Sequence, residues 1–256
     1  MSRFLSARFA DLEAYVPGEQ PQDMQYIKLN TNESPFPPAP AVAEAVNHTE
    51  IDHLNLYPDP EGKVLREKLA AHYGVKPENV FLANGSDELL NFFFMTFCDG
   101  GRPVAYPAVS YGFYPVYACL YQLPHTEIPL REDFRLEPED YCGIGKNIVI
   151  ANPNAPTGRI IGVDAIERIV RSNPDHVVMI DEAYIDFGGE SCLPLVERYE
   201  NLLVCQTFSK FRSLAGGRLG FALGSRELID ALNRVKYSFN PYNVSRLSIL
   251  AGAAAI

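Results

Sequence analysis

The sequence lacks paired cysteines, long apolar runs and a start that resembles a signal peptide. Its five cysteines are scattered, odd in number and never spaced C-x-x-C, which disfavours a disulfide framework or a zinc site and favours reduced thiols. The longest apolar runs, such as Leu89–Phe97, are too short to span a bilayer. We therefore expect a cytoplasmic protein without a membrane segment.

Positive charge is also scarce. The chain has 22 lysines and arginines against 32 aspartates and glutamates, a net charge of −10, and no basic run. Because phosphate backbones require clustered positive charge, nucleic acid is not an expected partner. Backbone amides and one or two basic groups still suffice for a small anion. A dinucleotide-binding domain is disfavoured because no G-x-G-x-x-G follows an early strand.

The residues that are present follow the pattern of an α/β domain. With 256 residues, of which 47% are apolar, the chain can form one large core and part of a second domain. The expected strands are Val80–Ala83, Val104–Tyr106, Asn147–Ala151, Val177–Asp181 and Leu202–Thr207. The expected helices are Val64–Tyr73, Ser86–Phe97, Ala165–Arg171 and Glu227–Lys236. Because the strands are unbroken apolar runs, helices should cover both faces of the sheet.

The two ends of the chain differ from this pattern. Residues 1–37 contain several prolines and polar residues, which predict an extended arm. The last six residues, Ala251–Ile256, are typical of a helix interior and carry no stop signal. The sequence therefore looks cut within a helix.

Lys210 follows a buried strand, in a segment that continues to Arg218. A lysine at the edge of a buried strand is costly unless it is used, and desolvation favours the uncharged amine that attacks a carbonyl. Ser209 and Arg218 could meet a phosphate, the arginine through a forked contact. Taken alone, Lys210 would more often be a surface lysine at a strand end.

Acidic residues lie at two other strand ends. Asp181 ends a strand at the edge where open α/β sheets bind ligands, and its carboxylate could pair with a pyridinium nitrogen. A cap for the following segment explains Asp181 equally well. Ser86 and Asp87 open a helix after another strand, where free amides and the helix dipole form an anion site. A capping side chain at the helix start is the alternative role of Ser86.

A turn and an aromatic residue complete the set. The prolines and glycine of Asn152–Gly158 predict a tight turn that could contain a cis peptide bond. Tyr111 could stack on a flat ring, although a core tyrosine is the more common outcome. Each signal is modest alone, but together they follow successive elements of one α/β sheet.

In this order the segments resemble the class I and II aminotransferases of the aspartate aminotransferase fold, and among them most closely the histidinol-phosphate aminotransferases. The resemblance extends from Tyr15 to the last residue. It implies a fold-type-I transferase, with a mostly parallel central sheet sandwiched by helices, an N-terminal arm and an incomplete C-terminal small domain. The implied divisions are the arm and a small-domain segment at 1–37, the large cofactor-binding domain at 38–240 and the start of a linking helix at 241–256.

The resemblance also implies a cofactor, pyridoxal 5'-phosphate, and a role for each site residue. Lys210 would form the internal aldimine and then move the proton between Cα and the cofactor. Asp181 would bind the pyridine nitrogen, Tyr184 would lie near the phenolic oxygen, and Tyr111 would stack on the ring. The implied phosphate-binding residues are Ser86, Asp87, Ser209 and Arg218.

Three further residues extend the implied site beyond one subunit. Tyr57 would reach the cofactor phosphate of the neighbouring subunit, Tyr15 would close over the substrate, and Asn32 falls in a substrate-side segment. Together they imply a homodimer with shared active sites. Its implied reaction moves an amino group between histidinol phosphate, or a similar donor, and 2-oxoglutarate in histidine biosynthesis.

The sequence departs from the family pattern at two places. Many relatives have an asparagine before Pro-Thr-Gly that contacts the phenolic oxygen. Here that position is Ala155, and Asn154 is the implied substitute. The family's C-terminal domain supplies an arginine for the substrate carboxylate, and the sequence stops before it. If these 256 residues are the whole protein, we expect cofactor binding to survive while transamination is crippled.

Three other functions fit the same residues. A threonine-phosphate decarboxylase or an aromatic-amino-acid aminotransferase would use the same cofactor-binding side chains, and the residues that would discriminate them lie beyond the end of the sequence. A catalytically silent dimeric relative would keep only the fold. Intact Lys210, Asp181 and Arg218 argue against such decay.

Overall fold

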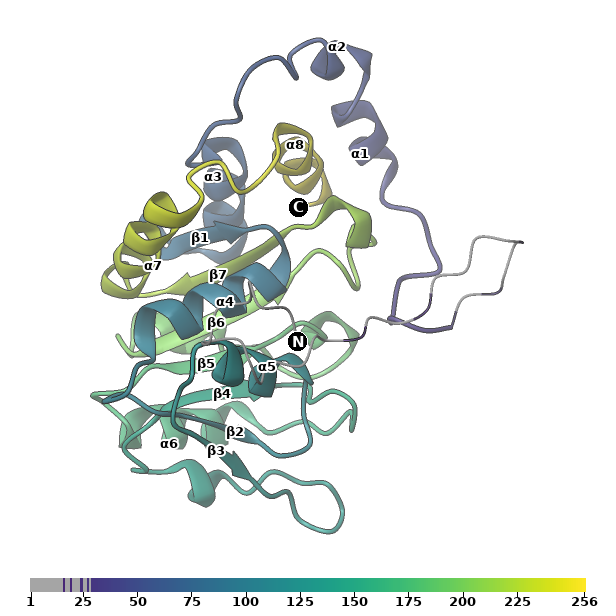
Figure 1. The fold of residues 1–256 in the computed structure, drawn as a ribbon. Helices are drawn as coiled ribbons and strands as arrows, with labels where there is room; N and C mark the ends of the chain where they lie inside the picture. Colours follow the sequence, from purple (N-terminus) through teal and green to yellow (C-terminus); the bar gives the residue numbers. More distant parts are fainter. Residues whose placement is uncertain (1–15, 17–18, 20–23, 25–26, 28) are drawn as a thin grey trace, which may run out of the picture.

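The computed structural model describes residues 16, 19, 24, 27 and 29–256. Within them, one seven-stranded sheet has the order β1-β7-β6-β5-β4-β2-β3 (Figure 1). Neighbouring strands are parallel, except that β7 is antiparallel to both β1 and β6. The strands are β1 Val80–Ala83, β2 Val104–Pro107, β3 His125–Ile128, β4 Asn147–Ala151, β5 Val178–Asp181, β6 Leu202–Thr207 and β7 Gly220–Gly224. The predicted α/β class and mostly parallel sheet are confirmed.

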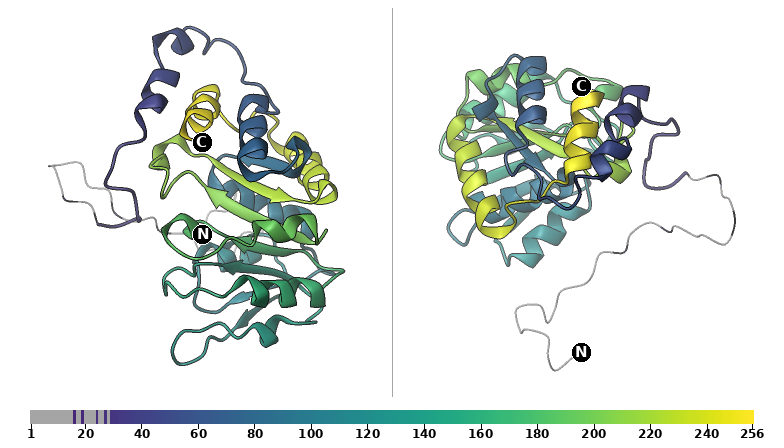
Figure 2. Two further views of the ribbon diagram at one scale, coloured as in Figure 1. Left: turned by 180° about the vertical axis from the view of Figure 1, so that it is seen from behind. Right: turned by 90° about the horizontal axis from the view of Figure 1, so that it is seen from above.

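Helices cover both faces of this sheet, as the two views from behind and above also show (Figure 2). None of the helices in the described residues has the length and apolar character that crossing a membrane requires. The helices are α1 Pro40–Ala45, α2 His48–Ile51, α3 Lys63–Tyr73, α4 Gly85–Phe97, α5 Phe113–Leu120, α6 Val163–Ser172, α7 Arg226–Phe239 and α8 Arg246–Ala255.

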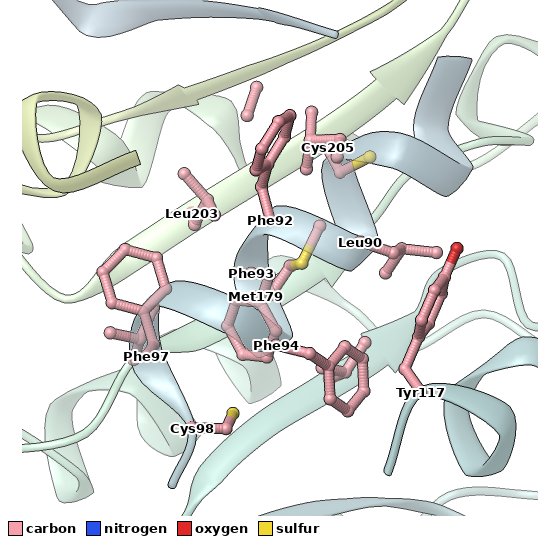
Figure 3. Packing of buried hydrophobic residues seen from close by; sticks show 14 of the residues in the cluster. Leu90, Phe92, Phe93, Phe94, Phe97, Cys98, Tyr117, Met179, Leu203 and Cys205 are labelled. Carbon is pink, nitrogen blue, oxygen red and sulfur yellow. The ribbon is translucent and has the colours of Figure 1, made fainter. Parts of the chain in front are cut away.

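The central strands are mostly apolar because each of their faces is buried. Successive residues of a strand point to opposite faces. Met179 of β5 packs in the layer that contains α4, α5 and α7, whereas Val178 and Ile180 pack in the layer that contains α6. Figure 3 shows the first layer, in which the phenylalanines of α4 meet Met179, Leu203 and Cys205. Burial on both faces therefore accounts for strands without polar alternation.

Two strands, β3 and β7, were not predicted from the sequence. The edge strand β3 carries His125, Thr126 and Glu127, and only its Ile128 is buried, so it lacks an apolar run. The strand β7 reads Gly-Phe-Ala-Leu-Gly, and its glycines are typical of turns rather than strands. At the C-terminal end of the chain, the apolar character of the last residues correctly predicts the helix α8.

The start of helix α4 differs from the prediction. The helix begins at Gly85, one residue early, and its N-cap is Asn84. The backbone amide of Asn84 donates to Oε2 of Glu88 at 2.6 Å, so the first turn is closed by a glutamate. The prediction that Ser86 caps the helix is therefore wrong, because Ser86 lies inside the first turn.

Strand β7 passes very close to this helix start. A Cβ atom on Gly220 would lie 2.7 Å from the carbonyl carbon of Gly85 and 2.7 Å from the backbone nitrogen of Ser86. Real Cβ atoms do not approach backbone atoms so closely, so only glycine fits at this position. The contact fixes the first turn of α4 against the sheet.

We expect Gly220→Ala to push the first turn of α4 away from β7 and to lower the free energy of unfolding by about 1–3 kcal/mol. Urea denaturation measures the change. The matched control is Gly100→Ala, since a Cβ atom there meets nothing within 4 Å. Equal unfolding midpoints for the two variants would show that the contact is not tight.

Candidate active site

A cavity of about 90 Å³ lies at the carboxyl ends of the central strands. The parallel strands β4, β5 and β6 all end at this edge, which is where open α/β sheets bind ligands. Of the ten predicted cofactor-binding residues, eight line the cavity and two, Asn154 and Tyr57, do not. The lining residues are Ser86, Asp87, Tyr111, Ala151, Ala155, Asp181, Ala183, Tyr184, Ser209, Lys210 and Arg218.

One part of the cavity is suited to an anion. The first backbone N–H groups of α4 have no carbonyl partner within the helix, and Ser86 and Ser209 add hydroxyl donors. Arg218 adopts a left-handed backbone conformation with φ of 45°. Its guanidinium lies over Gly85, where a Cβ atom would come within 2.7 Å of Nη2. Amides, hydroxyls and a guanidinium at a helix N-terminus together form an anion cup.

Asp87 links this cup to the wall of the cavity. Its Oδ2 lies 3.1 Å from Nη2 of Arg218, and its Oδ1 accepts a hydrogen bond from the Tyr111 hydroxyl at 2.7 Å. Burial, with the Asp87 charge adding to it, raises the pKa of Tyr111 far above its usual value. Tyr111 is therefore a neutral donor, and its hydrogen bond fixes the ring at the cavity wall.

Asp181 is the buried carboxylate of the site, with 4% of its surface exposed. Its Oδ2 accepts from the Tyr114 hydroxyl at 3.0 Å and its Oδ1 from the Ala183 amide at 3.1 Å. Burial raises the pKa of Asp181 to about 6, although both hydrogen bonds act in the opposite direction. A cationic group bound in the cavity would relieve this cost of burial.

Lys210 meets residues from the N-terminal segment. Its Nζ donates to the carbonyl oxygen of Thr31 at 3.1 Å and lies 5.7 Å from the centre of the Tyr184 ring. The Tyr184 hydroxyl accepts from Nδ2 of Asn32 at 3.0 Å. Three predicted residues that are far apart in sequence, Asn32, Tyr184 and Lys210, thus come together at the mouth of one cavity.

The side chain of Asn154 forms hydrogen bonds within its own turn and to the loop after β2. Its Nδ2 donates to the carbonyl of Val109 at 3.0 Å and to Oγ1 of Thr157 at 2.9 Å, and its Oδ1 accepts from Ser110 at 2.7 Å. Its neighbour Ala155 lines the cavity instead. The role of Asn154 as the replacement for the missing asparagine stays a prediction. The turn itself contains cis peptide bonds before Pro153 and Pro156, as its proline content predicts.

A second, wider cavity adjoins the first, with a volume of about 310 Å³. Tyr184 and Ala155 line both cavities, so the two meet at these residues. Asn32, Ile160 and Phe187 also line the second cavity. The combined space can therefore hold a bound group together with a molecule that reacts with it.

Tyr57 and Tyr15 are not placed in the cavity. Tyr57 is 80% exposed, and its ring stacks on Tyr242 with 4.6 Å between the ring centres. The stacking holds Tyr57 on the surface without burying it, so it does not line the cavity of its own chain. Tyr15 lies outside the described residues.

Sequence reasoning missed three of the residues around the cavity. Tyr114 binds Asp181, and the signal for it is its position three residues after Tyr111, close enough for both rings to be presented from one short segment. The small residues Ala151 and Ala183 line the cavity. Alanine carries no chemical signal, so only the fold reveals that these positions must be small.

The fold and the cavity define a class of protein. A lysine amine can form an imine with an aldehyde, a buried carboxylate can pair with a protonated ring nitrogen, and the anion cup can hold a phosphate. The lysine, the carboxylate and the anion cup lie in one cavity at the edge of a mostly parallel sheet. Together they define an α/β enzyme that uses a phosphorylated aldehyde as its cofactor. The chain belongs to the family "Aminotransferase class I and II", whose family model matches residues 24–256.

Similar proteins within this family include two histidinol-phosphate aminotransferases. The chain is 53% identical over 259 residues to histidinol-phosphate aminotransferase 1 of Bordetella parapertussis, and 51% identical over 257 residues to the histidinol-phosphate aminotransferase of Brachyspira hyodysenteriae. Each comparison covers 100% of this chain and 73% of the relative.

Solved structures agree in fold. The histidinol-phosphate aminotransferase of Sinorhizobium meliloti, in complex with pyridoxal-5'-phosphate, is 27% identical with a TM-score of 0.80. The similarity covers 88% of this chain and 62% of that chain. An aspartate aminotransferase of Thermus thermophilus with maleate has a TM-score of 0.79 at 24% identity, which indicates a common fold alone.

Proposed function

We propose that this protein is a pyridoxal-phosphate-dependent aminotransferase that moves an amino group between histidinol phosphate and 2-oxoglutarate in histidine biosynthesis. One observation carries the proposal: Lys210, Asp181 and the anion cup line a single cavity in a chain about half identical, over its whole length, to histidinol-phosphate aminotransferases. Membership of the family supports transamination as the reaction. The names of the similar relatives support histidinol phosphate as the amino donor.

The side chains of the cavity fit pyridoxal phosphate. Ser86, Ser209, Arg218 and the amides of α4 would hold the phosphate, and Tyr111 would lie against the ring. Asp181 would pair with the ring nitrogen, which satisfies a carboxylate that is otherwise costly to bury. When bound, the cofactor supplies a ring that accepts electrons from the substrate carbon.

The remaining chemistry belongs to residues of the chain. Lys210 would hold the cofactor covalently through Nζ and, once substrate has displaced it, take the proton from the substrate Cα as a general base. The hydrogen bond from Asn32 fixes the Tyr184 hydroxyl at the mouth of the cavity. Tyr184 would thereby donate to the phenolic oxygen in a fixed direction.

The second cavity is the proposed site for the side chain of the amino donor. It adjoins the first cavity at Tyr184 and Ala155, and its lining contains Ile160 and Phe187. Apolar and aromatic walls suit a flat imidazole ring. The acceptor 2-oxoglutarate would use the same space in the second half of the reaction.

We also infer a homodimer with shared active sites. An exposed Tyr57, held by stacking on Tyr242 and absent from the cavity of its own chain, supports a contact with the neighbouring subunit's cofactor phosphate. Closure of Tyr15 over the substrate, the domain division at 37 and 240, and the cytoplasmic location stay predictions.

An amino-donor screen against 2-oxoglutarate, carried out with the full-length protein, tests the proposal. We expect kcat/KM for histidinol phosphate to exceed that for aromatic amino acids by at least about 10²-fold. Aromatic donors of equal efficiency would make the protein an aromatic-amino-acid aminotransferase. Release of carbon dioxide from threonine phosphate would make it a decarboxylase. No absorbance change on adding pyridoxal phosphate would make it a silent relative.

A further inference from the structure

Arg212 connects two loops that carry residues of the proposed site. It lies two positions after Lys210, and its partner Asp186 lies two positions after Tyr184. The Nη1 atom of Arg212 is 3.0 Å from Oδ2 of Asp186, and 11% of the arginine side chain and 30% of the aspartate side chain are exposed. This ion pair therefore ties the loop after β6 to the loop after β5 in a partly buried setting.

The guanidinium of Arg212 is held on several sides. Its Nη1 also donates to the carbonyl oxygen of Thr207 at 3.3 Å, which closes the loop that contains Lys210. Its plane lies over the ring of Phe208, at 5.3 Å, and over that of Phe221, at 5.8 Å. Aromatic faces and fixed acceptors leave the side chain little freedom to move.

A chain of hydrogen bonds continues from Arg212 to the end of β5. Nη2 of Arg212 donates to the Tyr73 hydroxyl at 2.8 Å, and that hydroxyl donates to Oε1 of Gln206 at 2.7 Å. Nε2 of Gln206 then donates to Oε2 of Glu182 at 2.9 Å. Glu182 is 1% exposed and directly follows Asp181.

Glu182 is well satisfied at the far end of this chain. Its Oε2 also accepts from the Ser191 hydroxyl at 2.6 Å, and its Oε1 accepts from the Cys192 amide at 2.8 Å. Such a network can hold a buried carboxylate in place. Arg212 is thus linked by contacts on one side to the Tyr184 loop and on the other to the residue next to Asp181.

We propose that Arg212 is a positioning residue, which fixes the loop of Lys210 relative to Tyr184 and Asp181 through Asp186 and Tyr73. The proposal rests on the proposed function, because it concerns the lysine that would hold pyridoxal phosphate. Arg212 lines neither cavity, so it would touch neither cofactor nor substrate. Its effect on the site is exerted through the Lys210 segment.

The test uses two variants of the whole protein. Arg212→Met keeps an unbranched side chain over Phe208 and Phe221 but removes the charge and the donors, and Asp186→Asn removes only the opposite charge. The first readout is the pH midpoint of the absorbance of bound pyridoxal phosphate without substrate. The second is the dissociation constant of pyridoxal phosphate.

We expect both variants to shift the absorbance midpoint in the same direction and to weaken pyridoxal phosphate binding about ten-fold. The double variant should be no worse than the more affected single variant, because both substitutions break one connection. Arg212→Lys, which keeps the charge but loses the fork, should fall between wild type and Arg212→Met.

The matched control is Arg246→Met, which breaks a partly buried ion pair with Glu50 at 2.7 Å, away from the cavity. If Arg212→Met and Asp186→Asn lower the urea midpoint like this control while absorbance midpoint and binding are unchanged, the residue is only structural and the proposal is overturned. If Arg212→Met does not fold, Asp186→Asn alone decides by the same criteria. Wild-type protein that does not bind pyridoxal phosphate would instead refute the proposed function, and this inference with it.

Discussion

Lys210→Ala is expected to abolish steady turnover and to leave the fold intact. The substitution removes both the amine that holds the cofactor and the base that takes the proton from the substrate Cα. Loss of a general base alone costs about 10²–10⁴-fold in rate, and loss of the covalent link adds to it. The measurement is the steady-state rate with histidinol phosphate and 2-oxoglutarate, with the urea midpoint as the check on folding.

The fold should tolerate this substitution because Lys210 makes few contacts. Its Nζ donates to one backbone oxygen, that of Thr31, and the side chain is only partly buried. Lys63→Ala on helix α3 is the matched control, since 70% of that side chain is exposed. Borohydride treatment followed by mass spectrometry should find pyridoxal phosphate fixed at Lys210 in the wild type. Measurable steady catalysis by Lys210→Ala would contradict the assignment of Lys210 as the residue that binds the cofactor.

The apolar strands of the fold were predictable because both of their faces are buried. The pattern of short apolar runs locates β1, β2, β4, β5 and β6 to within one residue at either end. It fails for β3, whose edge position permits polar residues, and for β7, where glycine is required by the approach to α4. The local sequence indicates which strands are buried on both faces. The residues of β3 and β7 instead reflect where these two strands lie in the sheet.

The residues of the cavity were predictable from the sequence where their side chains are charged or reactive. Lys210 follows a buried strand and Asp181 ends one, where a charged side chain is costly unless it binds something, so their position is informative. The connection through Tyr73, Gln206 and Arg212 was not predictable, because its members come from three elements and no spacing in the sequence relates them. Asn154 shows the converse, since the residue implied as a substitute for the family's asparagine is hydrogen-bonded to Val109 and Thr157 and does not line the cavity.

Asp181→Asn should lower kcat by about 10²-fold or more, because the amide no longer holds the ring nitrogen in its protonated form. The side chain keeps its size and can still accept from the Ala183 amide, so the cavity should be preserved. Steady-state rates at saturating substrate measure the change. Asp175→Asn, at an exposed turn, is the control. A loss of only a few-fold would argue for a different pyridoxal chemistry.

The same substitution is expected to stabilise the protein without its cofactor. The folded-state pKa of Asp181 is raised by burial from 3.8 to about 6, so its contribution to stability is complete below about pH 4 and is lost as the pH rises through 6. Above pH 6 the wild type buries a charged carboxylate that the asparagine variant lacks. The variant should therefore be more stable at pH 8, by on the order of 1–3 kcal/mol, and the difference should vanish toward pH 4.

Urea titrations of both proteins at pH 4, 6 and 8, with and without pyridoxal phosphate, measure this dependence. A protonated ring nitrogen bound beside Asp181 provides the charge partner that the empty cavity lacks, so the cofactor should stabilise the wild type more than the variant. An asparagine variant that is less stable at pH 8 without the cofactor would show that Asp181 is not strained by burial. The expected result instead makes the carboxylate a cost to folding that is offset only when the cofactor binds.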